Sequence, residues 1–142
     1  MDENIVTWDE AYSVGFELID NQHKKLVGMV NALFTGCKQG AVAADIAYVR
    51  VIDKALEYAK THFSDEEKYM RQADYPKLRE HKKQHEKFVK EILKSVKIFE
   101  KGNTAPIEMA MFLKNWLLNH IAVSDKQYAP YLAKLGSAPN LP

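Results

Sequence analysis

The sequence predicts an all-α protein, folded as an up-down-up-down four-helix bundle with an N-terminal arm and a short C-terminal helix. Four long segments carry apolar residues at intervals of three and four, the helical period, and no strong strand pattern occurs between them. Glycine, proline and asparagine divide these segments at short junctions, which favour antiparallel neighbours. The length of 142 residues suits one domain. We expect residues 1–142 to form an arm (1–17), a bundle (18–127) and a short helix with a tail (128–142).

The first two helices are expected at about 20–38 and 43–72, on either side of a junction at Gly36 and Gly40. Asp20 follows an apolar residue and is predicted to be the N-cap of the first helix. Apolar residues recur along both segments, which predicts one buried stripe on each helix.

The last two long helices are expected from near Pro76 to near Lys101 and from near Pro106 onwards, because proline is favoured in the first turn of a helix. A short fifth helix is predicted at 129–135. The first residues contain Trp8, Tyr12 and Phe16. This segment is too aromatic for a solvated tail, so we predict an arm packed across the bundle.

Composition excludes several classes of partner. The net charge of +1 gives no reason to expect nucleic acid or an anionic membrane. The most apolar stretch, Met109 to Ile121, is too short and too polar to insert in a bilayer. Cys37 is the only cysteine, so no internal disulfide can form, and nothing in its position indicates a role. The N-terminus lacks the apolar core of a signal peptide, and we expect a cytoplasmic protein.

All five histidines fall on the predicted apolar stripes, and most have a second potential metal ligand nearby. The candidate ligands are His23, His62, Glu66, His81, His85, His120 and Asp125. Residues four apart project from one face of a helix, so each long helix can deliver at least one ligand to the bundle axis. Seven ligands are too many for one ion and suit two. His120 and Asp125 are five apart, roughly 140° around a regular helix, so an irregularity is predicted near residues 122–124.

Each part of this pattern has an ordinary explanation when taken alone. A single buried histidine is more often a hydrogen-bonded core residue, and two histidines four apart often lie on a solvated face. Glu66 could pair with Lys60 or Lys68, and Asp125 could be a polar residue at a helix end. The joint arrangement, with every stripe carrying a ligand, favours a metal centre.

Imidazole-rich sites suit iron, zinc or copper. Structural zinc uses four ligands, usually with cysteine, whereas ferritin-like di-iron proteins use Glu-x-x-His pairs, which this chain lacks. A nitrogen-rich site with only two carboxylates stabilises reduced metals, which favours reversible binding over oxidation.

The pattern resembles the hemerythrin family across nearly the whole chain. The resemblance covers the order and spacing of the seven ligands and the residues around them: 19–26 (IDNQHKKL), His62-Phe63 with Glu66, Tyr75-Pro76 before His81, and 116–121 (WLLNHI). It implies two non-haem iron ions joined by an oxo or hydroxo bridge, Fe2+ in the deoxy form and Fe3+ in the oxy and met forms.

By this resemblance, His81, His85 and His120 would hold a six-coordinate iron, and His23 and His62 a five-coordinate iron. Glu66 and Asp125 would bridge the two ions. Dioxygen would bind at the five-coordinate iron as a hydroperoxide, which implies a reversible oxygen carrier or store rather than a catalyst.

An apolar pocket around the oxygen would exclude protons and water. The residues predicted to line it are Leu26, Phe63, Trp116, Leu117 and Ile121. Tyr128 is a candidate for a hydrogen bond near the site, whereas Tyr58 is as consistent with plain core.

Two other functions use the same centre. One is a redox enzyme that turns over peroxide or nitric oxide, or oxidises ferrous iron. The other is a sensor of oxygen or nitric oxide that alters a surface read by another protein, although no docking motif is evident. Dioxygen is the expected partner and an oxygen-consuming enzyme a candidate recipient, and we expect a monomer.

Overall fold

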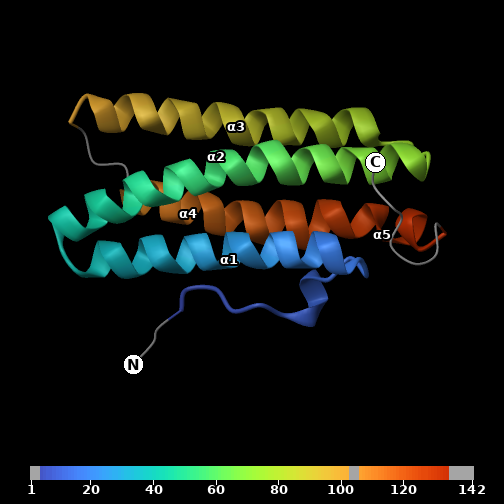
Figure 1. Cartoon of the computed structure of the whole chain (residues 1–142), viewed down its shortest axis with the longest axis horizontal. Helices are drawn as coiled ribbons and strands as arrows, with labels where there is room; N and C mark the ends of the chain where they lie inside the picture. Colours follow the sequence, from blue (N-terminus) through green and yellow to red (C-terminus); the bar gives the residue numbers. More distant parts are fainter. Residues whose placement is uncertain (1–3, 103–105, 135–142) are drawn as a thin grey trace.

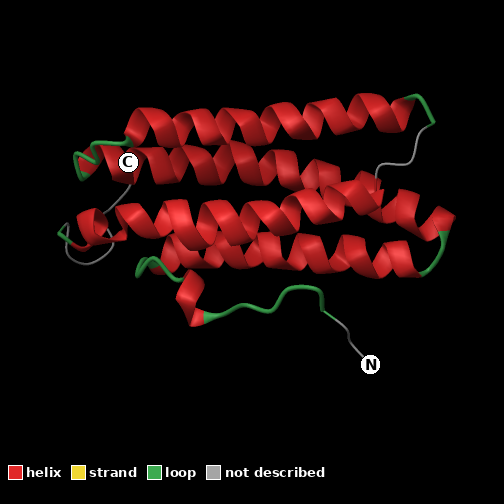
Figure 2. Ribbon diagram, turned by 180° about the vertical axis from the view of Figure 1, so that it is seen from behind, coloured by secondary structure: helices red, strands yellow, loops and turns green. Residues whose placement is uncertain are grey.

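The computed structural model describes residues 4–102 and 106–134, and in these ranges every regular element is a helix. The elements are the 3-10 turn η1 (Glu10–Tyr12), α1 (Glu17–Lys38), α2 (Ala41–Gln72), α3 (Leu78–Glu100), α4 (Pro106–Trp116), the π-helix η2 (Leu117–Asp125) and α5 (Lys126–Ala133). Figure 1 shows four long rods lying side by side, with α4, η2 and α5 forming the last rod. Figure 2 shows the same bundle from behind, with short loops at both ends. The predicted all-α bundle is confirmed.

The start of α1 differs from the prediction. Asp20 is not the N-cap, because α1 begins at Glu17 and Phe16 occupies the cap position without a side-chain hydrogen bond. The Asp20 carboxylate instead accepts the backbone N–H of Val14 (2.9 Å) and the hydroxyl of Ser13 (2.5 Å). A short acidic side chain can accept from either direction, and here it ties the arm to the first turn of α1.

The start of α3 also lies later than predicted. Pro76 occupies a turn in which the carbonyl of Tyr75 accepts the N–H of Leu78 (3.3 Å), the first residue of α3. Proline suits the second position of such a turn as well as the first turn of a helix, because both need a φ near −65°. The short C-terminal helix starts at Lys126, and the predicted end at residue 135 lies outside the described residues.

The arm packs against the bundle, as its aromatic content predicted. Val6 is buried, its N–H donates to Oδ1 of Asn31 (3.0 Å), and its carbonyl accepts from Nδ2 of Asn31 (2.8 Å). Trp8 and Tyr12 meet edge to face, with ring centroids 5.6 Å apart. One amide side chain in α1 therefore satisfies both backbone groups of an arm residue, where no strand partner exists.

Helices α1 and α2 approach closely near their connecting loop. A Cβ atom added to Gly36 would lie 2.5 Å from Cβ of Ala47 and 3.1 Å from the carbonyl oxygen of Ala43. Only a residue without a side chain fits there. The contact sets the separation of the two helices at this end of the bundle.

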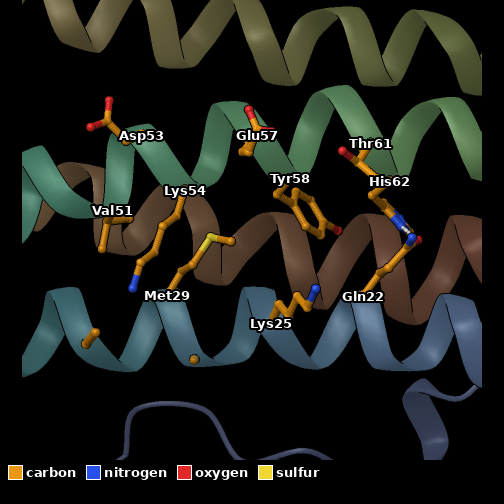
Figure 3. A pocket seen from close by; sticks show the side chains of 12 residues that line it. Gln22, Lys25, Met29, Val51, Asp53, Lys54, Glu57, Tyr58, Thr61 and His62 are labelled. Atoms are coloured by element: carbon orange, nitrogen blue, oxygen red, sulfur yellow. Dashed lines mark hydrogen bonds between the residues drawn. The ribbon is translucent and has the colours of Figure 1, made fainter.

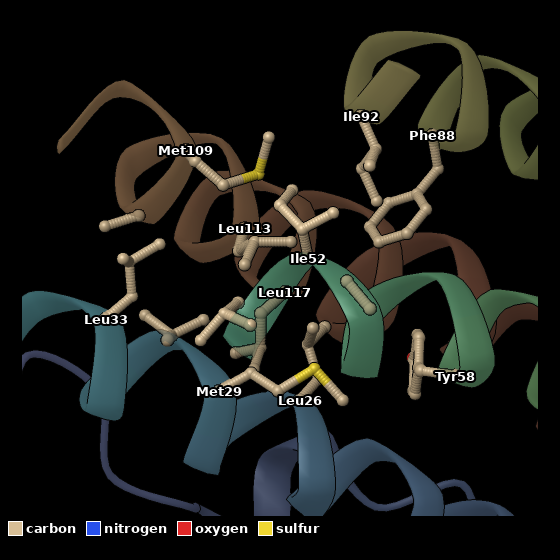
Figure 4. Packing of buried hydrophobic residues seen from close by; sticks show 14 of the residues in the cluster. Leu26, Met29, Leu33, Ile52, Tyr58, Phe88, Ile92, Met109, Leu113 and Leu117 are labelled. Carbon is tan, nitrogen blue, oxygen red and sulfur yellow. The ribbon is translucent and has the colours of Figure 1, made fainter. Parts of the chain in front are cut away.

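Two hydrophobic clusters occupy the two ends of the bundle. The larger contains Leu26, Leu33, Ile52, Phe88 and Leu113 among others (Figure 4). The smaller is formed by Val14, Phe16, Ile19, Tyr69, Met70, Tyr75, Tyr128 and Leu132. The candidate ligands lie between these two clusters along the bundle. They form a polar layer with an apolar cluster on either side of it. Over the residues described, no helix is long and apolar enough to cross a membrane.

Candidate metal centre

All seven candidate ligands converge in this polar layer. Glu66, His81, His85, His120 and Asp125 form one group whose ligand atoms lie within 4.8 Å of one another, and His23, His62, Glu66 and Asp125 form a second such group. None of the seven side chains is more than 4% exposed. The two carboxylates belong to both groups, the placement required of bridges between two ions.

The π-helix η2 brings His120 and Asp125 to the same centre. Hydrogen bonds that span five residues widen the helical turn, so side chains five apart lie nearly above one another. His120 Nε2 is 3.0 Å from Oδ1 of Asp125. The irregularity predicted near residues 122–124 is confirmed and extends over Leu117–Asp125.

The separations between donor atoms match those expected around shared ions. Two donors each about 2.1 Å from one ion and at right angles are about 3.0 Å apart. On the three-histidine side, the Nε2 atoms of His81 and His85 lie 2.8 Å from Asp125 Oδ1 and 2.9 Å from Glu66 Oε1, respectively. On the other side, His23 Nε2 is 3.1 Å from Asp125 Oδ2 and His62 Nε2 is 3.2 Å from Glu66 Oε2.

Several of these donor atoms lie close to one another without forming a hydrogen bond. Nε2 of His85, Nε2 of His120 and both carboxylate oxygens of Asp125 are buried and have no hydrogen-bond partner among the described residues. Leaving such atoms buried and unpaired costs free energy, so native proteins rarely do so without another ligand. Their lone pairs converge on common points, and the residues present therefore fit two cations.

Comparison with known proteins agrees with this geometry. Residues 14–132 match the family model described as the hemerythrin HHE cation-binding domain. The chain is a member of the hemerythrin family. The bacteriohemerythrin of Stenotrophomonas maltophilia is 33% identical over 88% of this chain and 80% of its own length. That of Pseudomonas aeruginosa strain LESB58 is 37% identical over 87% and 78%.

Further hemerythrins agree in sequence and in fold. The myohemerythrin of Sipunculus nudus is 32% identical over 85% of this chain and 88% of its own length. A crystal structure of a wild-type hemerythrin superposes with a TM-score of 0.75 at 30% identity, covering 91% of this chain and 98% of the other.

A second layer of hydrogen bonds orients three of the five imidazoles, those of His62, His85 and His120. Nδ1 of His62 lies 2.5 Å from Oε1 of Gln22, whose Nε2 donates to Asp65 (2.8 Å). His85 and His120 make the corresponding contacts, with their Nδ1 atoms 2.9 Å from Glu67 and 2.6 Å from Gln84. An acceptor at Nδ1 holds the proton there and leaves the Nε2 lone pair free for a metal. Periodicity did not identify these partners, because each bond crosses from one helix to another.

The two carboxylates raise the pKa values of His23 and His81. Burial lowers the pKa of His23, but the close Asp125 and Glu66 carboxylates outweigh burial and raise that pKa to about 9. The same balance raises the pKa of His81 to about 10. Burial raises the pKa values of Glu66 and Asp125, yet the surrounding imidazoles bring both well below their usual range. Binding of a metal cation would therefore displace protons from the imidazoles.

Two buried tyrosines, Tyr58 and Tyr128, border the centre, and within the described ranges only Tyr128 has a hydrogen-bond partner. The Tyr128 hydroxyl donates to Oε2 of Glu66 (2.6 Å), so the hydrogen bond considered for Tyr128 is present. Burial and the charges of Glu66 and Asp125 raise the pKa of Tyr128 well above 10, so its phenol keeps the proton. Tyr58 stacks on His62 at 4.8 Å between ring centroids, and its hydroxyl has no partner among the residues described.

The five residues predicted to line an oxygen pocket take two kinds of position. Leu26, Leu117 and Ile121 are fully buried in the larger cluster. Phe63 lies flat on His85, with ring centroids 3.8 Å apart, and Trp116 lies flat on His120 at 3.9 Å. The two aromatic rings thus pack against the three-histidine side. Phe63 contacts His62 only at a tilt, at 5.7 Å.

A groove between α1 and α2 reaches the two-histidine side. Its volume is about 740 Å3, and its outer rim carries Lys25, Asp53, Lys54 and Glu57. Buried residues including Met29, Val51, Tyr58 and His62 form its inner wall (Figure 3). The groove thus contacts His62, a candidate ligand of the second group, and the Tyr58 ring that stacks on it.

Proposed function

We propose that this hemerythrin binds dioxygen reversibly at a di-iron centre and serves as an oxygen carrier or store. His81, His85 and His120 would hold one iron, His23 and His62 the other, and Glu66 and Asp125 would bridge them. When bound, two ferrous ions supply the two electrons that dioxygen accepts on binding and returns on release. The protein supplies the enclosure and the fixed donor set.

The observation that carries the proposal is the unequal number of donors in the two groups. One group offers five protein ligands and the other four, and both share the same two carboxylates. The iron beside His23 and His62 would therefore retain one more open position, where a small ligand can bind. His62 also lines the groove between α1 and α2, so an iron held by His23 and His62 would lie on that side of the centre.

The surroundings favour release over further reaction. Leu26, Leu117 and Ile121 are fully buried near the centre, and none can donate a proton. Reduction of oxygen beyond reversible binding consumes protons, so an apolar wall slows it. Among the described residues, the two carboxylates of the centre, Glu66 and Asp125, have pKa values well below their usual range, so neither carboxylate holds a proton.

The test is a visible absorption spectrum of Fe(II)-loaded protein, recorded before oxygen, after oxygen and after its removal. We expect two iron ions per chain and a charge-transfer band that appears with oxygen and fades when oxygen is removed. His23→Ala and His62→Ala should lose the band, whereas Tyr48→Phe, far from the centre, should keep it.

Two outcomes would overturn the proposal. One is a band that persists in both histidine variants. The other is direct conversion to a stable diferric spectrum with steady consumption of peroxide or nitric oxide from an added donor, which would identify a redox enzyme instead.

The proposal includes a monomer working in the cytoplasm. A monomer fits the enclosed site, since every candidate ligand comes from one chain. Light scattering at the concentration used for oxygen binding tests this part, and a dimer would contradict it.

A further inference from the structure

The Tyr58 hydroxyl is one of the buried polar groups near the centre that lack a hydrogen-bond partner among the described residues, together with Nδ1 of His23 and Nε1 of Trp116. Tyr58 is only 6% exposed, and its hydroxyl oxygen is buried without a hydrogen-bond partner among the described residues. A buried hydroxyl left unpaired costs free energy, and a valine or leucine would fill the same space without that cost. Its presence therefore calls for an acceptor that is not a protein group.

The position of the ring directs the hydroxyl towards the two-histidine side. Tyr58 lies one turn before His62 on α2, and the two rings are nearly parallel, at 19°. Figure 3 shows the ring extending from α2 towards α1, with its hydroxyl end on the side of His62. Phe63 and Phe88 meet the same ring at 5.9 and 6.2 Å, so it is packed on several sides and cannot turn away easily.

The second buried tyrosine provides the contrast. The Tyr128 hydroxyl has an acceptor in Glu66, at 2.6 Å, and so acts on a protein ligand of the centre. Tyr58 stacks on His62 of the group that has four ligands instead of five, and its hydroxyl has no such acceptor in the described part of the chain. The missing ligand and the missing acceptor lie on the same side of the centre.

We propose that the Tyr58 hydroxyl donates a hydrogen bond to the small ligand that occupies the open position beside His23 and His62. The ligand class is a molecule of two or three atoms with a lone pair on its far end, such as dioxygen or azide. Tyr58 is then a positioning residue that strengthens ligand binding and slows ligand release. This inference rests on the proposed function only in taking the two-histidine side as the open one.

Azide binding to the diferric protein tests the proposal. Tyr58→Phe removes one oxygen atom and keeps the ring stacked on His62. We expect its azide dissociation constant to rise about ten-fold or more, the loss typical of one hydrogen bond to a charged group. The control Tyr48→Phe removes a hydroxyl that bonds to Ser95 (2.7 Å) and should leave azide affinity unchanged. Iron content and thermal unfolding are compared first, so that only equally loaded variants enter the comparison.

A measurement on the unaltered protein covers the case in which Tyr58→Phe fails to load iron. Ultraviolet resonance Raman bands of tyrosine respond to hydrogen bonding of the hydroxyl. Azide should shift one tyrosine signal in the wild-type protein, and the proposal is refuted if no signal moves.

Equal azide affinity in Tyr58→Phe and wild type would also refute the proposal, as would a wild-type protein that does not bind azide. Azide binding does not require reversible oxygenation. A protein that binds azide through Tyr58 but not dioxygen would therefore refute the carrier function alone.

Discussion

Removing the hydrogen bond from Tyr128 to Glu66 would show how much that bond stabilises the polar layer when no metal is bound. Both side chains are fully buried, and the donor–acceptor distance is 2.6 Å. Tyr128→Phe keeps the ring and its contacts in the smaller cluster and deletes only the hydroxyl. The carboxylate would then lose its one phenolic donor, with no water-accessible surface to compensate.

The expected cost follows from the charge and the burial. A hydrogen bond to a buried charged group contributes about 1.5–3 kcal/mol. A chain of this length loses about 3 °C in Tm for each kcal/mol, so Tyr128→Phe should lower Tm of the metal-free protein by about 5–10 °C. Tyr48→Phe, which loses a bond to the neutral hydroxyl of Ser95, should cost about 0.5–1.5 kcal/mol.

The assay is thermal and urea unfolding of the chelator-treated protein, followed by far-ultraviolet circular dichroism. A double-mutant cycle with Glu66→Gln isolates the pairwise energy, because the two side chains are in direct contact. We expect a coupling energy above about 1 kcal/mol. A Tyr128→Phe variant no less stable than Tyr48→Phe, or a coupling energy near zero, would show that the carboxylate is held by the histidines alone.

Three further perturbations test other parts of the structure. Gly36→Ala should destabilise the protein by about 1–3 kcal/mol, because the added methyl group has no room between α1 and α2. At Gly28 an added methyl group meets no atom, so Gly28→Ala should stabilise α1 by about 0.5–1 kcal/mol. Equal effects of the two substitutions in urea unfolding would contradict the close approach of α1 and α2 at Gly36. The metal-free protein should lose stability as the pH rises from 6.5 through 9 and 10. The protonated forms of His23 and His81 stabilise the fold fully only below the ordinary histidine pKa of 6.5, and this stabilisation is lost as the pH passes their raised pKa values. An unchanged Tm between pH 6.5 and 10 would count against the contacts of these two histidines with Glu66 and Asp125. Asp20→Ala should speed amide hydrogen exchange at the arm by about five-fold, as expected from losing about 1 kcal/mol of tethering, while exchange in α3 stays constant.

Much of the candidate site could be predicted because helix geometry is local. Residues three or four apart must share a face, so the pairs His62 with Glu66 and His81 with His85 were identifiable without any tertiary information. The spacing of His120 and Asp125 did not fit that rule, and the misfit itself predicted the irregularity that the π-helix confirms.

Predictions failed where one side chain had two suitable uses. Asp20 can cap a helix or tether an incoming segment, and Pro76 can begin a helix or a turn. The local sequence permits both outcomes in each case. The choice depends on where the neighbouring segment runs, which the bundle decides.

The sequence by itself determined the helices, the stripe on which each ligand lies, and hence that seven ligands would meet in one layer. Only the tertiary structure decided the partners across helices: Gln22 with His62, Tyr128 with Glu66, and, within the ranges that the structure describes, no partner for the hydroxyl of Tyr58. Helical periodicity sets the direction of a side chain around its own axis. The rotation and separation of one helix relative to the next come from packing of the whole core, so contacts between helices are not encoded in any single segment.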